Sequence, residues 1–193
     1  MKNKKRIIWG IIAVVTVMVV GLSLYGIFGK EKPFEPEQGP YTQSELQLMN
    51  KRIRKVMHQD ENNRSYYGGC YLDNGNLIIM VTKEFKNAMP EVKEAIEKEE
   101  GVILRKVKYT LVELEELQDE IWDMRMKLEE TGSESTKKFL EDFNTGGVYE
   151  MENRVGVGIK DLTLWKQMKF RTIFHLWGDG RILFESNSGV WLD

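Results

Sequence analysis

The chain has 193 residues, of which 41% are hydrophobic and 30% charged, and its formal net charge is −2. This length suffices for one ordinary domain or two small domains that share a core. The slightly acidic balance argues against nucleic acid as a partner, because nucleic-acid-binding proteins present a basic face, and a single cysteine excludes an intramolecular disulfide.

An uncharged apolar run from Ile7 to Phe28 dominates the amino-terminal region. About 20 apolar residues are enough to cross a bilayer as one helix, and a helix satisfies its own backbone polar groups in lipid. The run therefore predicts a transmembrane signal-anchor at residues 7–29. A cleaved signal peptide is the alternative, but its cleavage site would have to lie inside the apolar run, at Gly21–Ser23.

The charges on either side of this run predict its orientation. Four basic residues precede the run, at Lys2, Lys4, Lys5 and Arg6. Basic and acidic residues are mixed after it, at Lys30, Glu31, Lys32, Glu35 and Glu37. Because positive charge stays on the cytoplasmic side, residues 1–6 are expected to form a cytoplasmic tail. The rest of the chain is then extracellular, and the protein crosses the cell membrane once.

Residues 30–40 hold three of the four prolines and are predicted to be an extended spacer. A helical region is expected at 41–64, with capping-box spacing at either Thr42–Glu45 or Ser44–Gln47. Its apolar face is predicted to consist of Leu46, Met49, Ile53 and Val56. Its basic face contains Lys51, Arg52, Arg54 and Lys55. That basic face is interpreted as solvated, and contact with anionic lipid is the alternative.

Residues 65–132 are predicted to form a first α+β unit. Asn74-Gly75 between two apolar runs favours a β-hairpin, because both central residues of such a turn need positive φ. A helix that starts at Pro90 and ends before Gly101 follows the hairpin, and a strand is expected from Val102. A long amphipathic helix is then predicted from its apolar spacing at Leu111, Leu114, Leu117, Ile121, Met124 and Leu128.

Residues 133–193 are predicted to repeat that unit at an offset of 78 residues. Gly146-Gly147-Val148-Tyr149 corresponds to Gly68-Gly69-Cys70-Tyr71 at this offset. Three alternating apolar residues of the first hairpin, Leu77, Ile79 and Val81, map onto Val155, Val157 and Ile159. A helix over about 162–177 and a strand over 181–185 complete the unit. The sequence thus predicts an α+β fold in which a long helix joins two tandem hairpin-helix-strand units.

This arrangement resembles the propeptide of α-lytic-protease-like secreted serine proteases, and still more its looser bacterial relatives. The resemblance is carried by three stretches: Tyr67-Gly68-Gly69-Cys70-Tyr71-Leu72-Asp73-Asn74-Gly75-Asn76-Leu77, Val107–Glu115 and Tyr149–Val157. In that family the propeptide is a folding template for the protease that follows it, and then an inhibitor of it. No protease follows in this chain, so the resemblance implies an architecture and a protein partner rather than an activity.

The residues that could perform chemistry have plainer explanations. Ser188 lacks the Gly-x-Ser-x-Gly context that exposes a nucleophile, so a triad with His58 or His175 is not expected. His58 is expected to complement a helix dipole, and His175 to pack among aromatic residues. Cys70 is expected to be a small buried strand residue. No catalytic residue, metal site or cofactor is therefore predicted.

These expectations favour a membrane-anchored, non-enzymatic protein-interaction module outside the cytoplasm. Its partner would be an extracytoplasmic protein such as a protease or an envelope component. Two alternatives stay open from the sequence. One is an envelope hydrolase whose carboxylate site cannot be identified, and the other is an accessory subunit of a membrane sensor, which would need a second protein because residues 1–6 are too few to signal.

Overall fold

The computed structural model describes residues 38–59 and 61–187. The predicted cytoplasmic tail, the signal-anchor and most of the spacer lie outside these described residues, as does Ser188. None of the helices in the described part of the chain is both long enough and apolar enough to cross a membrane. All the elements presented below belong to one compact unit.

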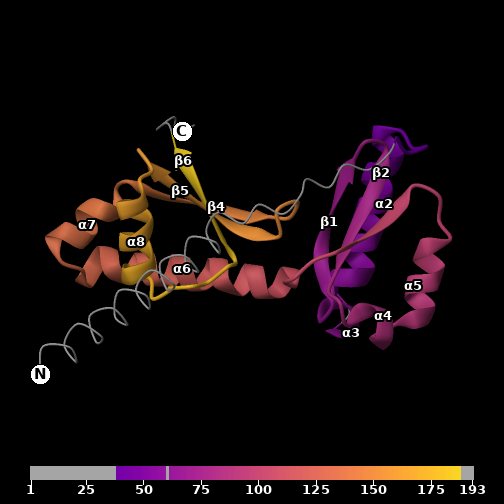
Figure 1. Ribbon diagram of the computed structural model, residues 1–193, viewed down its shortest axis with the longest axis horizontal. Helices are drawn as coiled ribbons and strands as arrows, with labels where there is room; N and C mark the ends of the chain where they lie inside the picture. The colour runs from indigo at the N-terminus through magenta and orange to yellow at the C-terminus, as the bar shows by residue number, and fades with distance from the viewer. Residues whose placement is uncertain (1–37, 60, 188–193) are drawn as a thin grey trace, which may run out of the picture. The chain divides into compact units, whose positions relative to one another are not determined.

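Helices and strands alternate in a mixed α+β arrangement (Figure 1). The described helices are α2 (Gln43–Gln59), α3 (Glu61–Arg64), α4 (Phe85–Ala88), α5 (Pro90–Glu97), α6 (Leu111–Thr131), α7 (Glu134–Leu140) and α8 (Leu164–Ile173). The described strands are β1 (Tyr67–Asp73), β2 (Asn76–Val81), β3 (Val102–Lys106), β4 (Phe143–Tyr149), β5 (Arg154–Lys160) and β6 (Ile182–Asn187). The predicted α+β class is therefore confirmed.

Two small sheets with the same strand arrangement organise the chain. One has the order β1-β2-β3 and the other β4-β5-β6. In each, an antiparallel hairpin is followed by at least one helix and by a third strand that pairs parallel to the second strand of the hairpin. The hairpin predicted at Asn74-Gly75 is present, and both residues have the expected positive φ, 46° and 75°.

The Gly-Gly pairs produce the same irregularity in both sheets. The register of β1 against β2 shifts between Tyr67 and Gly69, and that of β4 against β5 shifts between Thr145 and Gly147. Gly69 and Gly147 have φ values of 111° and 91°, which side chains other than glycine rarely adopt. The repeated motif thus encodes a β-bulge at equivalent positions.

The second strands of the two hairpins do not follow the predicted offset. Cys70 lies opposite Ile79, and Val148 lies opposite Val155, so Val155 is the structural counterpart of Ile79 rather than of Leu77. The mapping of Leu77 onto Val155 is wrong by two residues, because fewer residue pairs separate the bulge from the turn in the second hairpin than in the first. A shift of two keeps the same pleat face, so both apolar sets are still buried.

Helix α2 begins with the capping box at Thr42 and Glu45. The Thr42 amide donates to Glu45 Oε2 at 2.9 Å, and the Glu45 amide donates to Thr42 Oγ1 at 3.4 Å. The predicted apolar face is wrong at Val56, which is 58% exposed, while Met57 is 1% exposed and packs in the core. Eleven residues complete about three helical turns, so Met57 rather than Val56 lies beneath Leu46.

The end of the spacer is part of the fold. The Gly39 amide donates to the Asn74 carbonyl at 2.7 Å, and the Tyr41 amide donates to the Gly75 carbonyl at 3.3 Å. Tyr41 also packs against the core of the first sheet. Gly39, near the end of the spacer predicted at 30–40, and Tyr41, which follows the spacer, therefore bind the β1–β2 turn.

Helix α6 follows the predicted apolar spacing. Leu111, Leu114, Leu117 and Ile121 are buried, whereas Met124 and Leu128 are half-buried against the second core. Thr110 and Glu113 form a complete capping box at its start. Glu113 is thus a capping residue of α6. The short helices α4 and α7 were not predicted, since neither spans enough residues to show a period.

Phenylalanines form the centre of the second core. The rings of Phe143, Phe170 and Phe174 contact one another in pairs. Those of Phe170 and Phe174 are stacked, with 4.4 Å between their centroids. Phe170 also meets Phe184 edge-on. Phe170 comes from helix α8. This helix covers residues 164–173, so it is shorter than the helix expected over about 162–177.

Candidate functional site: a polar clasp beside an open cleft

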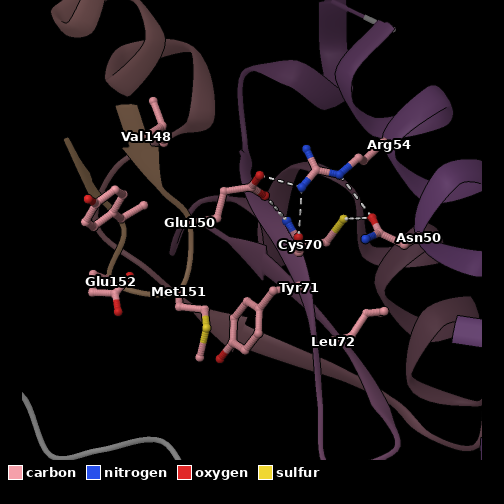
Figure 2. A pocket seen from close by; sticks show the side chains of 10 residues that line it. Asn50, Arg54, Cys70, Tyr71, Leu72, Val148, Glu150, Met151 and Glu152 are labelled. Carbon is pink, nitrogen blue, oxygen red and sulfur yellow. Dashed lines mark hydrogen bonds and ion pairs between the residues drawn. The ribbon is translucent and has the colours of Figure 1, made fainter. Parts of the chain in front are cut away.

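An open cleft of about 410 Å³ lies beside β1 (Figure 2). Helix α2 contributes one side, the end of β1 the floor, and the β4–β5 hairpin the other side. The lining residues are Asn50, Arg54, Cys70, Tyr71, Leu72, Val148, Tyr149, Glu150, Met151 and Glu152. Most of these side chains are polar or aromatic, and two carboxylates, Glu150 and Glu152, are among them.

Arg54 and Glu150 meet over the backbone of Cys70, and we call this arrangement the clasp. The guanidinium of Arg54 forms an ion pair with Glu150 and donates to the Cys70 carbonyl at 3.1 Å. The other carboxylate oxygen of Glu150 accepts from the Cys70 amide at 2.8 Å. Figure 2 shows both side chains converging on this one peptide segment. Glu150 is the more enclosed partner, with 19% of its side chain exposed against 42% for Arg54.

The clasp occupies hydrogen-bonding groups at a sheet edge. Strand β1 is the outer strand of its sheet, with β2 on only one side. The Cys70 amide donates to Glu150, and the Cys70 carbonyl accepts from Arg54. These two side chains therefore replace the hydrogen bonds that a neighbouring strand would form. Edge strands that are capped in this way are protected from pairing with other chains.

A second hydrogen bond orients Arg54. Its Nε donates to Asn50 Oδ1 at 3.0 Å, one helical turn earlier on α2. Partial burial lowers the pKa of Arg54, but the hydrogen bond and the charge of Glu150 outweigh that effect and raise its pKa above the ordinary value. Arg54 is thus a fixed cation of the clasp rather than part of a solvated basic face, which corrects the prediction for this residue.

The thiol of Cys70 lies beneath the clasp and is 1% exposed, as predicted for a buried strand residue. Its Sγ accepts from Tyr67 Oη at 2.9 Å and donates to Asn50 Oδ1 at 3.0 Å. Burial raises the pKa of Cys70, and the lowering effects of Tyr67 and Arg54 do not cancel it. Burial likewise raises the pKa of Tyr67 far above its ordinary value. Both groups are neutral, so the arrangement favours packing over nucleophilic chemistry.

The β4–β5 loop is held by further hydrogen bonds at Met151 and Asn153, which follow Glu150. Arg105 donates to the Met151 carbonyl at 2.7 Å and to Tyr71 Oη at 3.0 Å. Asn153 is 3% exposed and exchanges two hydrogen bonds with the backbone of Tyr109, at 2.9 and 2.8 Å. Glu150 is therefore presented to Cys70 by a loop that is held at two of the residues that follow it.

The two histidines lie apart from this site. His58 is in the last turn of α2, and its Nε2 lies 3.4 Å from Glu115 Oε1, while its ring faces Tyr67 at 6.4 Å between centroids. His175 was expected to be partly buried on a helix. It is exposed instead, with a φ of 56°, just beyond the end of α8. Within the described residues, no three metal-ligating side chains converge.

Sequence reasoning did not identify Asn50, Arg54 or Glu150 as parts of one site. Arg54 and Glu150 are 96 residues apart, and nothing in the local pattern of either residue indicates the other. The one usable signal was the Gly-Gly bulge. A Cβ on Gly69 would lie 2.5 Å from Glu150 Oε2, so the absent side chain at this glycine makes room for the carboxylate.

No protein-family model matches the chain, and no curated protein matches it significantly.

Proposed function

We propose that the chain is a non-enzymatic protein-interaction module, held outside the cytoplasm by a transmembrane signal-anchor at residues 7–29. The apolar run and the basic residues before it support the anchor and its orientation. The two sheets are then a tandem duplication of one hairpin-helix-strand unit, joined by α6, in keeping with the resemblance to protease propeptides. That resemblance supports a protease or an envelope protein as the partner.

The observation that carries the proposal is the open cleft along the outer edge of β1. Alternate residues of a strand direct their backbone groups to the same side, so the amide and carbonyl of Leu72 share the direction of those of Cys70. Leu72 lines the cleft and lies beyond the clasp. An extended segment of a partner protein can pair with the edge at Leu72, beyond the residue that the clasp occupies, through main-chain hydrogen bonds, with the flanking side chains selecting its sequence.

Photo-cross-linking from inside the cleft tests this function. A photo-reactive residue at Leu72 in the membrane-bound, full-length protein is expected to give one discrete adduct with a partner protein. The matched control carries the same group at Lys98, whose side chain is 72% exposed, and is expected to give no such adduct. A small molecule recovered from the cleft in place of a protein, or equal adducts from both positions, would contradict the proposal.

A further inference from the structure

Helix α8 presents an apolar face to its surroundings. The exposed fractions are 48% for Leu164, 71% for Trp165 and 40% for Met168. Residues that are three and four apart lie on one side of a helix, so Leu164 and Trp165 both adjoin Met168. We call these three residues the α8 face. Thr172, one further turn along, is also exposed and is uncharged.

The charged residues of α8 are all directed to other parts of the protein. Lys166 donates to Asp142 Oδ2 at 2.9 Å and to the Lys160 carbonyl at 2.6 Å. Lys169 donates to the Ser135 carbonyl at 3.2 Å. Arg171 is 7% exposed and donates to the Leu176 carbonyl at 2.8 Å. The α8 face therefore contains no charge, although the helix has three cations.

The opposite side of α8 is apolar as well, because Phe170 is fully buried in the second core. A surface helix normally has one apolar side and one charged side. A helix that is apolar on two sides is typically buried on both, so a second apolar surface is expected to cover the exposed side of α8. Trp, Leu and Met together suit the boundary between lipid headgroups and acyl chains, where tryptophan is enriched.

We propose that the α8 face inserts into the interfacial layer of the membrane that carries the anchor. This inference rests on the proposed signal-anchor. Residues 29–38 connect the apolar run to the first described residue and reach at most about 35 Å when fully extended. A domain on such a short tether meets the same membrane at high effective concentration, so a small apolar face is sufficient for contact.

The charges around the α8 face favour lipid over a charged protein surface. Lys160 and Asp161 are both exposed beside the start of the helix. Lys138 and Glu141 are exposed at the end of α7, the helix that Lys169 contacts through Ser135. One basic and one acidic residue cancel at each place, while the cations of Lys169 and Arg171 donate to carbonyl groups of the protein. Insertion is therefore expected in uncharged, zwitterionic lipid.

Depth-dependent fluorescence quenching tests this insertion. The full-length chain, which has five tryptophans, is prepared with Trp165 as the sole tryptophan and phenylalanine at the other four positions. It is reconstituted in phosphatidylcholine vesicles whose acyl chains are brominated near the headgroup. The matched control keeps only Trp122, which is 45% exposed on α6, and a third version keeps only Trp9 in the predicted anchor. Circular dichroism confirms that all three versions are folded.

Trp165 is expected to be quenched at least about twofold more strongly than Trp122, and Met168→Glu should remove most of that difference. Equal quenching of Trp165 and Trp122, while Trp9 is quenched by deeply brominated lipid, overturns the inference and leaves the anchor intact. An unquenched Trp9 in a chain that alkaline carbonate extracts from the vesicles overturns both. A Trp165 that is shielded from aqueous iodide but is not quenched by lipid also overturns the inference, since a protein then covers the face.

Discussion

At the scale of single residues, Arg54, Glu150 and the backbone of Cys70 satisfy one another's hydrogen-bonding groups in the clasp. Arg54→Ala removes the donor to the Cys70 carbonyl and the cation that pairs with Glu150, and Glu150→Ala leaves the Cys70 amide without its acceptor. Each substitution is expected to lower the free energy of unfolding by about 1–3 kcal/mol, because buried polar groups lose their partners. Urea denaturation of the two single variants and the double variant measures the coupling between them.

The chain has a matched control pair in Lys98 and Glu94, whose side chains are 72% and 70% exposed. Exposed pairs of this kind contribute at most about 0.5 kcal/mol, because solvent screens them. Additive effects of Arg54→Ala and Glu150→Ala, with no more coupling than in the control pair, would mean that the clasp does not act as a unit.

The buried thiol and phenols predict a loss of stability in alkali. Burial raises the pKa of Cys70 from its ordinary value of 9.0, and it raises those of Tyr67 and Tyr71. The unfolded chain therefore releases these protons at a lower pH than the folded chain does. Their contribution to stability is complete below about pH 8.5 and falls as the pH rises beyond the unfolded-state pKa of Cys70.

Urea denaturation between pH 7.5 and pH 10.5 is expected to show this decline. Cys70→Ala should flatten its first part, nearest pH 9, and leave the later part due to the tyrosines. If the wild-type protein and Cys70→Ala lose stability with the same slope near pH 9, then the thiol is not the titrating group.

The sequence predicted the burial of Cys70 but not what surrounds it. A small apolar residue within an alternating run belongs in a strand, and this local signal is sufficient for its burial. The partners of Cys70 come from α2 and from the β4–β5 loop. Contacts over such sequence separations depend on the tertiary fold, which no local pattern contains. For the same reason His175 was misplaced, since its aromatic neighbours concealed the end of the helix at Ile173.

At the scale of elements, the two bulges allow a matched comparison. Gly69 and Gly147 both have positive φ, so alanine is strained at either position, by about 1 kcal/mol or more. At Gly69 the new Cβ would also lie 2.5 Å from Glu150 Oε2, whereas at Gly147 the nearest side-chain atoms lie 4.0 Å away. Gly69→Ala is therefore expected to destabilise the protein more than Gly147→Ala does, as thermal denaturation can measure.

The clasp explains this difference, and so the difference should depend on Glu150. With Glu150→Ala as the background, the two glycine substitutions are expected to cost similar amounts. A penalty at Gly69 that persists unchanged in that background would show that the carboxylate is not the cause.

Elements with a clear local sequence signal, such as a turn motif or a long apolar period, were predictable, and elements without such a signal were not. Both central residues of the Asn74-Gly75 turn need positive φ, and Asn-Gly between two apolar runs is a strong local signal of a tight hairpin. The spacing along α6 covers several turns and leaves little ambiguity. Helix α4 has only four residues, so no period can be read from it. The two-residue difference in register between the two hairpins could not be predicted from the sequence, because a shift by an even number of residues preserves the alternation of a strand.

At the scale of the whole molecule, the question is where the tether ends and the fold begins. Gly39 and Tyr41 hydrogen-bond to the β1–β2 turn, and the Tyr41 ring lies over Gly101, where a Cβ would be only 2.6 Å from the ring. Removing residues 1–29 is therefore expected to leave the free energy of unfolding unchanged within about 0.5 kcal/mol. Removing residues 1–41 is expected to lower it by about 2 kcal/mol or more, since two hydrogen bonds and the packing of one aromatic ring are lost.

Urea denaturation of the two truncated chains distinguishes the structural part of the spacer from the tether. Tyr41→Ala in the chain that lacks residues 1–29 is the control that separates the ring from the backbone bonds, and it should account for most of the loss. Equal stability of both truncated chains would mean that residues 39–41 are only a linker. The tether would then be longer than residues 29–38, and it would no longer hold the α8 face close to the membrane.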